Sequence, residues 1–157
     1  MSESAQTRRN FLFLATASVL AGAGQTGEAA AQFPTPPTAE ETANIQVVTR
    51  FCEAFSGDDV DRIMSFMADP CSYRVTEAQD PIKGFAAVKA RIATLVTTAE
   101  RFEILHSSAR GPMVFNERID YFAPGGRLKS WHGVGVFFVK DGKIVEWQDF
   151  TIALERA

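Results

Sequence analysis

Hydrophobic side chains between residues 38 and 98 recur every three or four positions, the spacing that places them on one face of an α-helix. This pattern predicts three helices. The first begins near Thr38 or Glu41 and stops at residues 56–58 (Ser-Gly-Asp). A second, short helix ends at residues 68–70 (Ala-Asp-Pro), and a third runs from Phe85 to about Thr98. Their expected buried positions are Ile45, Val48, Cys52, Phe55, Val60, Ile63, Met64, Met67, Val88, Ile92, Leu95 and Val96.

After residue 100 the hydrophobic period changes from about 3.6 to 2, which is typical of β-strands. Four consecutive strands are expected, over residues 101–107, 113–122, 128–139 and 143–152, and a shorter one over 71–76. The Asp141-Gly142 pair indicates a tight hairpin before the last strand. The order predicts an α+β domain in which three N-terminal helices pack on one face of a curved, mostly antiparallel sheet. Such a cone would enclose a pocket.

The first thirty or so residues differ in composition from the rest of the chain. Arg8 and Arg9 precede a short apolar run, and Ala29-Ala30-Ala31 follows it as a small-residue cleavage pattern. We interpret residues 1–31 as a twin-arginine signal peptide, 32–40 as a Pro-rich linker and 41–157 as the folded domain. The apolar run is too short to span a membrane. The mature protein is therefore expected to be periplasmic or secreted, and free of the membrane once the signal is removed.

Charge and cysteine content narrow the possible functions. The net charge is −3 and no run of Lys or Arg appears, so neither a nucleic acid nor an anionic membrane surface is expected as a partner. The two cysteines, Cys52 and Cys71, have no metal-ligand spacing; buried thiols are expected, although an oxidising compartment would also permit a disulfide. Glycine-rich phosphate loops and nucleophile elbows are absent from the sequence. No metal and no cofactor is expected.

Three charged residues lie in otherwise apolar strands. Arg118 and Asp120 point to the same face of one strand, about 6.7 Å apart. Asp149 lies in the last strand, next to aromatic residues. Charges in apolar surroundings are costly unless they are paired or functional. An arginine between two carboxylates would hold both ionised or let them share a proton. Like charges push the two pKa values apart, and two acids poised differently can run acid and base chemistry together.

These motifs resemble the limonene-1,2-epoxide hydrolase family over about residues 45–152. The similarity is carried by Glu117-Arg118-x-Asp120, Gly135-Val136-Phe137, Asp141-Gly142-Lys143-Ile144 and Trp147-x-Asp149. That family has the cone-shaped fold of nuclear transport factor 2, steroid isomerases and SnoaL-like polyketide cyclases. The resemblance implies that Asp149 activates a water, Asp120 donates a proton to the epoxide oxygen, and Arg118 bridges the two acids. It also implies that Tyr73 helps to hold the water.

The match is incomplete at one position, because Val75 stands where the family has a water-holding asparagine. A side chain of valine cannot hydrogen-bond a water, so Asp149 and Tyr73 would hold it alone. The substrate is expected to be a small hydrophobic epoxide that gives a vicinal diol. The residues expected to contact this substrate are Val75, Met64, Trp131, Trp147 and Phe150.

Other interpretations stay open at this point. The three charged residues could form a structural ion-pair network at the sheet rim, and Tyr73 could belong to the core. The same fold could support a ketosteroid-isomerase-like or SnoaL-like isomerase or cyclase, or a non-catalytic protein that binds a small ligand. Related proteins are commonly homodimers that pack through the outer sheet face. Phe137, Val139 and Ile144 suggest more apolar strand surface than one face can bury.

Overall fold

Thr38 has an extended backbone conformation and caps the first helix, α1 (Ala39–Glu53). Its hydroxyl accepts a hydrogen bond from the backbone N–H of Glu41 (3.2 Å), and the Glu41 carboxylate accepts one from the N–H of Thr38 (2.7 Å). This capping box satisfies backbone donors that the first turn leaves unpaired. The computed structural model describes residues 36–152. The predicted signal peptide and residues 32–35 of the predicted linker lie outside the described residues, and the last two linker positions belong to α1.

The remaining helical elements follow the predicted order. They are η1 (Ala54–Ser56), α2 (Val60–Met64), which Asp59 caps, and α3 (Phe85–Val96). Most of the positions expected to be buried are inaccessible to solvent, among them Val48, Cys52, Phe55, Ile63 and Ile92. Both cysteines are buried free thiols. In the described part of the chain, no helix is long and apolar enough to cross a membrane.

The strands form one six-stranded sheet in the order β2-β1-β6-β5-β4-β3. The four predicted C-terminal strands pair antiparallel with their sequence neighbours, as expected. The short N-terminal strand β1 instead pairs parallel with β6 and extends the sheet beyond the last hairpin. A turn of 3-10 helix, η2 (Pro124–Gly126), joins β4 to β5. The strands are β1 (Met67–Arg74), β2 (Ile82–Lys83), β3 (Ala99–Arg110), β4 (Met113–Phe122), β5 (Lys129–Lys140) and β6 (Lys143–Thr151).

The expected end of the second helix at residues 68–70 is wrong. Helix α2 ends at Met64, and β1 begins at Met67, which is paired with Ile144. Pro70 is tolerated in this strand because the pairing of β1 with β6 is interrupted between Met67 and Ser72. The proline therefore marks an irregular strand and not a helix terminus.

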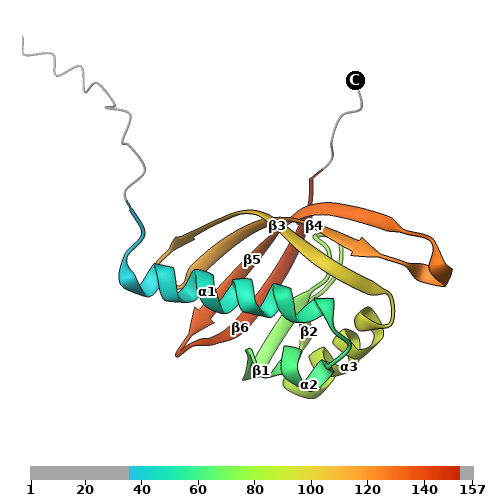
Figure 1. The fold of residues 1–157 in the computed structure, drawn as a ribbon. Coiled ribbons are helices and arrows are strands. Elements are labelled where there is room, and N and C mark those ends of the chain that lie inside the picture. The colour runs from blue at the N-terminus through green and yellow to red at the C-terminus, as the bar shows by residue number, and fades with distance from the viewer. Residues whose placement is uncertain (1–35, 153–157) are drawn as a thin grey trace, which may run out of the picture. The chain divides into compact units, whose positions relative to one another are not determined.

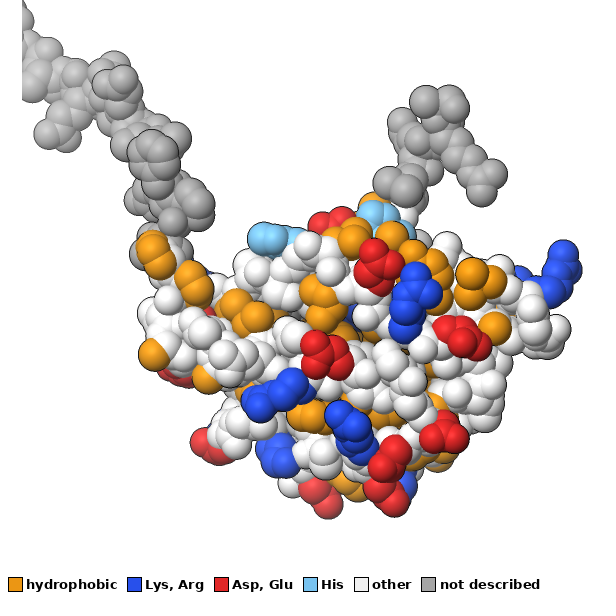
Figure 2. Space-filling view, in the orientation of Figure 1, with side chains coloured by type: hydrophobic (Ala, Val, Ile, Leu, Met, Phe, Trp, Pro, Cys, Tyr) orange, Lys and Arg blue, Asp and Glu red, His pale blue; other side chains and the backbone are white. Residues whose placement is uncertain are grey.

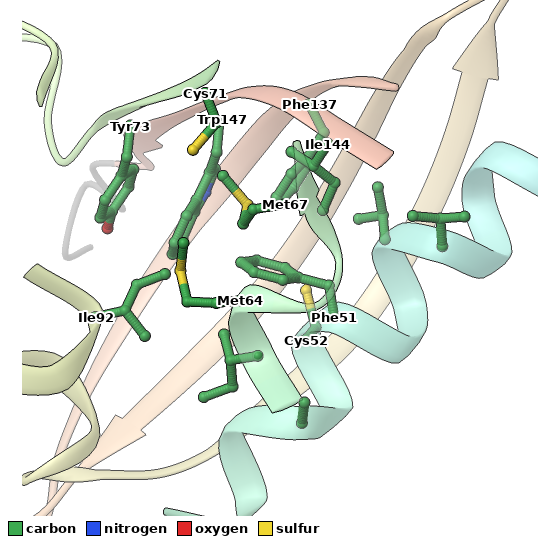
Figure 3. Packing of buried hydrophobic residues seen from close by; sticks show 14 of the residues in the cluster. Phe51, Cys52, Met64, Met67, Cys71, Tyr73, Ile92, Phe137, Ile144 and Trp147 are labelled. Atoms are coloured by element: carbon green, nitrogen blue, oxygen red, sulfur yellow. The ribbon is translucent and has the colours of Figure 1, made fainter. Parts of the chain in front are cut away.

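The helices lie on one face of the curved, unclosed sheet (Figure 1), with α1 against β3 and β4 and α3 against β1. Phe51 of α1 occupies the centre of the core, edge-on to Phe55, Phe137 and Trp147 at 5.1–5.8 Å between ring centroids (Figure 3). Phe137, Val139 and Ile144 are buried in this core, so they are not the outer apolar surface that the sequence suggested. Acidic and basic side chains are interspersed on the face shown in Figure 2.

Candidate active site

Strand register brings Arg118, Asp120 and Asp149 onto the helix-covered face of the sheet. Arg118 and Asp120 alternate with outward side chains on β4, and Asp149 lies two strands away on β6. The intervening strand β5 places Gly135 between Asn116 and Asp149, and Gly133 opposite Arg118. Because glycine has no side chain, Gly133 and Gly135 leave room for the long side chain of Arg118 to cross β5.

Arg118 joins the two acids directly. Its Nε donates to Asp120 Oδ1 at 2.9 Å, and its Nη2 donates to Asp149 Oδ1 at 2.8 Å. The guanidinium is fully buried, and the side chains of Asp120 and Asp149 are only 4% and 6% exposed. The three residues therefore do not form a solvent-exposed ion-pair network at the rim of the sheet.

Aromatic rings surround the guanidinium. The rings of Phe102, Trp131, Trp147 and Phe137 lie 5.3–5.9 Å from its central carbon, within the range of cation–π attraction. Its remaining terminal nitrogen, Nη1, is buried without an acceptor among residues 36–152. The aromatic walls exclude water and so strengthen the two ion pairs.

Asp149 receives more hydrogen bonds than Asp120. In addition to Arg118, Trp147 Nε1 donates to Asp149 Oδ1 at 2.7 Å and the Tyr73 hydroxyl donates to Oδ2 at 3.1 Å. Tyr73 is held flat against Trp147, with 3.7 Å between ring centroids and 11° between planes. Parallel pairing of β1 with β6 sets these two residues side by side. Among the described residues, only Arg118 donates to the side chain of Asp120.

Burial raises the pKa values of the two acids, and the charge of Arg118 acts in the opposite direction. Burial raises the pKa of Asp120 from 3.8 to about 7, although Arg118 acts to lower it, and the Asp149 charge adds to the rise. Burial also raises the pKa of Asp149, against Arg118 and the donors on Trp147 and Tyr73. Burial alone would lower the pKa of Arg118, but the two carboxylates outweigh it and raise the pKa.

One positive charge beside two buried acids favours a single ionised carboxylate. Three donated hydrogen bonds stabilise the anion of Asp149, whereas Asp120 has one. The hydrogen bonds therefore favour Asp149 as the ionised member, and Asp120, with a pKa of about 7, as the acid that holds the proton. The site holds a base and an acid that share one arginine.

Both acids line a cavity of about 210 Å³ between α3 and the sheet. This is below the roughly 300–1,000 Å³ of pockets for drug-sized ligands, so the cavity suits a small molecule. Most of its walls are apolar or aromatic. The lining residues are Tyr73, Val75, Thr76, Arg91, Leu95, Phe102, Asp120, Phe122, Trp131, Trp147 and Asp149.

The structure brings together most of the site residues that the sequence predicted. Tyr73, Val75, Trp131 and Trp147 line the cavity with the two acids, and Arg118 lies behind them. Val75 presents an apolar side chain there. Among residues 36–152, no three His, Cys, Asp or Glu side chains are grouped so that they could hold a metal.

Two predicted substrate contacts need correction. Met64 is 2% exposed in the core, where it packs near Phe51 and Trp147 (Figure 3), and it does not line the cavity. The helical period correctly predicted its burial, but burial alone does not place a side chain at a pocket. Phe150 follows inward-facing Asp149 on β6, so it points to the outer face and is 38% exposed.

Sequence reasoning missed several functional positions. Phe102, Phe122, Leu95, Thr76 and Arg91 line the cavity without any motif that marks them. The inward glycines of β5 did carry a signal, since glycine inside a strand often marks a close approach of another group. A Cβ at Gly135 would lie 2.2 Å from Arg118 Nη1, and one at Gly133 would lie 2.0 Å from the Trp131 ring.

Solved structures share this architecture. A limonene-epoxide-hydrolase-like epoxide hydrolase of M. tuberculosis is 25% identical, with a TM-score of 0.65 over 72% of this chain and 85% of that one. An epoxide hydrolase/cyclase-like enzyme, SalBIII, of pyran ring formation in the polyether salinomycin is 22% identical (TM-score 0.66; 71% of this chain, 92% of that one). A protein of Catenulispora acidiphila with a ketosteroid isomerase-like fold, in complex with trimethylamine, is 16% identical (TM-score 0.59; 66% and 83%).

The last two structures establish similarity of fold alone, because their sequence identities are low. They share with this chain the helices that cover a curved, unclosed sheet, which is the nuclear transport factor 2-like cone. The model of the SnoaL-like domain matches residues 48–147, which include Arg118, Asp120 and every residue that lines the cavity except Asp149. On this match the chain belongs to the SnoaL-like domain family.

Proposed function

We propose that the protein is an epoxide hydrolase of the limonene-1,2-epoxide hydrolase type, which adds water to a small epoxide in one step. The observation that carries this proposal is the buried Arg118, which joins two acids of different proton affinity at the wall of a small apolar cavity. A strained three-membered ring needs a positioned water and a proton for the leaving oxygen, and this pair of acids provides both functions.

The reaction follows from the roles of the three residues. Asp149 accepts a proton from water while the water oxygen forms a bond to one epoxide carbon. The carbon–oxygen bond of the ring breaks, and Asp120 gives its proton to that oxygen, so a vicinal diol is produced. Arg118 stays charged throughout and stabilises whichever carboxylate is ionised. Proton exchange with solvent then returns the proton from Asp149 to Asp120.

Hydrolysis of limonene oxide and styrene oxide in ¹⁸O-water tests this mechanism. We expect one labelled oxygen in the diol, and a decrease in kcat of about 10²–10⁴-fold for Asp149→Asn. Equal inactivity of the wild type and Asp149→Asn over a broad panel of epoxides would rule the hydrolase out.

Val75 favours a second candidate, a cyclase that uses the same acid and base. With an apolar side chain at that position, a hydroxyl group of the substrate can replace water as the nucleophile and close an ether ring. An epoxide with a hydroxyl group four or five bonds from the ring distinguishes the two. A cyclic ether as the main product would favour the cyclase, and a triol would favour the hydrolase. For a hydrolase, Val75→Asn should increase the rate of diol formation, since it adds a second group that can hold the water.

We also propose that the protein acts outside the cytoplasm, after removal of residues 1–31. The support for this is the Arg8-Arg9 pair ahead of an apolar run and a small-residue cleavage pattern. Replacement of both arginines by lysine should leave uncleaved protein in the cytoplasm. Cleaved, exported protein from that variant would contradict the twin-arginine route.

A further inference from the structure

Arg91 and Thr76 line the cavity but take no part in the acid–arginine–acid group. Arg91 lies on α3 four residues before Leu95, so the two side chains share a helix face and both reach the cavity. Its neighbour Ile92 is fully buried in the core. The helix that covers the cavity therefore contributes a positive charge to a wall that is otherwise mostly apolar.

Arg91 has no carboxylate partner within the described residues. None of the ion pairs or side-chain hydrogen bonds of residues 36–152 involves its guanidinium. Lys89, on the same helix, is by contrast paired with Asp61 at 2.6 Å. A guanidinium stays charged at any physiological pH, and its planar donors match a carboxylate in a bidentate arrangement. An unpaired arginine at a pocket is therefore a candidate anion-binding group.

Position relative to the acids supports this role. Arg91 is partly exposed while Asp120 and Asp149 are buried, so Arg91 lies nearer to solvent than the reacting groups. Its charge is close enough to the Tyr73 hydroxyl to act on the pKa of that group, in the direction opposite to burial. Thr76 follows β1 and lines the cavity together with Tyr73 and Val75. The cavity wall thus carries a partly exposed cationic group, Arg91, in addition to the buried acid–base group.

We propose that Arg91, assisted by Thr76, binds a carboxylate group of the substrate, so that the substrate class is a small, otherwise apolar epoxy acid. The epoxide part of this assignment rests on the proposed function, whereas the carboxylate site does not. The positive charge also offsets the repulsion that an acidic substrate would otherwise feel from ionised Asp149. A carboxylate held by Arg91 fixes the orientation of the rest of the substrate relative to Asp120 and Asp149.

A pair of unreactive ligands tests the carboxylate site without any turnover. Cyclohexanecarboxylate and cyclohexylmethanol have the same ring and differ at the charged end. By isothermal titration calorimetry, we expect the wild type to bind the acid at least about tenfold more tightly than the alcohol, as a charged hydrogen-bonded pair predicts. Arg91→Met should remove this preference, and Arg91→Lys should retain part of it.

Arg62→Met is the matched control, because Arg62 is an exposed arginine of α2 that does not line the cavity. It removes the same charge and should leave the preference intact. Equal affinity for acid and alcohol, no binding of either, a preference that persists in Arg91→Met, or one that Arg62→Met removes equally would each overturn the proposal.

Turnover separates this proposal from the proposed function. The probes are 3,4-epoxycyclohexanecarboxylate and its methyl ester, and the wild type should prefer the acid through a lower KM that Arg91→Met raises. Asp149→Asn should lower kcat by about 10²–10⁴-fold and still bind cyclohexanecarboxylate. If the wild type binds the carboxylate but opens neither epoxide, the hydrolase fails and the site stands. If it opens the ester as well as the acid, the hydrolase stands and the carboxylate site fails.

Discussion

Gly135 decides whether Arg118 can reach Asp149, because the guanidinium must cross β5 at this position. A Cβ here would lie 2.2 Å from Arg118 Nη1 and 2.5 Å from the Phe137 ring. Gly135→Ala should therefore displace the guanidinium and destabilise the fold by about 1–3 kcal/mol, the range for overpacked cores. We expect epoxide hydrolysis to fall at least about 100-fold, because a misplaced catalytic group loses that much.

Gly57→Ala provides the control for this substitution. Gly57 is exposed and has a negative φ, and a Cβ there would be 3.8 Å from its nearest neighbour, Ala54 O. Urea unfolding and kcat should both stay close to the wild type. A Gly135→Ala protein with unchanged stability and activity would show that Arg118 does not need the open path across β5.

Asp120 should make both activity and stability depend on pH. Its pKa of about 7 in the folded protein is above the roughly 3.9 of an unfolded aspartate, so folding favours the protonated acid between these values. The resulting contribution of Asp120 to the free energy of unfolding is complete below about pH 4 and is lost as pH rises through 7. The free energy of unfolding falls over this range by at most about 1.4 kcal/mol per pH unit. The proton needed for ring opening is lost over the same upper range, so kcat should fall above about pH 7.

Asp120→Asn isolates that titration, since an amide resembles the protonated acid in shape and carries no charge. The variant should lose hydrolysis but gain stability relative to the wild type as pH rises from 4 to 8, measured by urea unfolding at each pH. Asp58→Asn, at an exposed position, should show no such gain. Parallel pH profiles for the wild type and Asp120→Asn would contradict a proton on Asp120.

At the scale of elements, Glu41 connects α1 to the β3–β4 hairpin. One carboxylate oxygen completes the capping box with Thr38, and the other accepts a hydrogen bond from the N–H of Gly111 at 2.8 Å. Asn44, one turn on, donates to the carbonyl of Gly111 at 3.1 Å. Two contacts thus fasten the start of the helix to the tip of the hairpin.

Glu41→Ala should lower the free energy of unfolding, since it removes a cap and a backbone contact. Glu40→Ala is the control, because Glu40 is exposed in the same turn. The backbone bonds of Thr38 and Gly111 hold the pKa of Glu41 below its ordinary value. The difference between the two variants should therefore shrink in acid, and equal stabilities at pH 7 would refute this role.

Regular periods made most elements predictable from the sequence. The strand predicted over residues 113–122 coincides with β4, and the third helix was misplaced only at its end. The parallel pairing of β1 with β6 was not predictable, because it joins segments about 75 residues apart and leaves no local signal. The prediction that a helix ends at Pro70 was wrong. The local sequence favours a helix end there, but pairing with β6 makes these residues part of strand β1.

The triad was predictable from charge in apolar strands, but the cavity walls were not. Arg118, Asp120 and Asp149 stand out because buried charge is rare, and alternation placed them on one face. An apolar residue such as Met64 gives no comparable signal, since core and cavity wall share the same composition. Arg91 was missed because an arginine on a helix is ordinarily solvent-exposed.

At the scale of the whole molecule, the outer sheet face carries apolar side chains that no described element covers. Phe115 of β4 and Phe150 of β6 are 39% and 38% exposed, and Val134 and Val136 of β5 lie between them in the register. An uncovered patch of this kind indicates an interaction surface. We propose that a second copy of the chain covers it, because one self-complementary patch is sufficient for a two-fold dimer.

Analytical ultracentrifugation of the purified protein should therefore show a dimer. Phe115→Glu combined with Phe150→Glu should yield a folded monomer. In a two-fold dimer the new carboxylates of one copy would lie near those of the other copy, and like charges in an interface repel. Glu substitution of Leu128, which is exposed outside these strands, is the control and should leave the dimer intact. Asp149 and Phe150 point to opposite faces of β6, so the monomer should keep its active site. A wild type that sediments as a monomer, or a double variant that remains dimeric, would exclude this face as the interface.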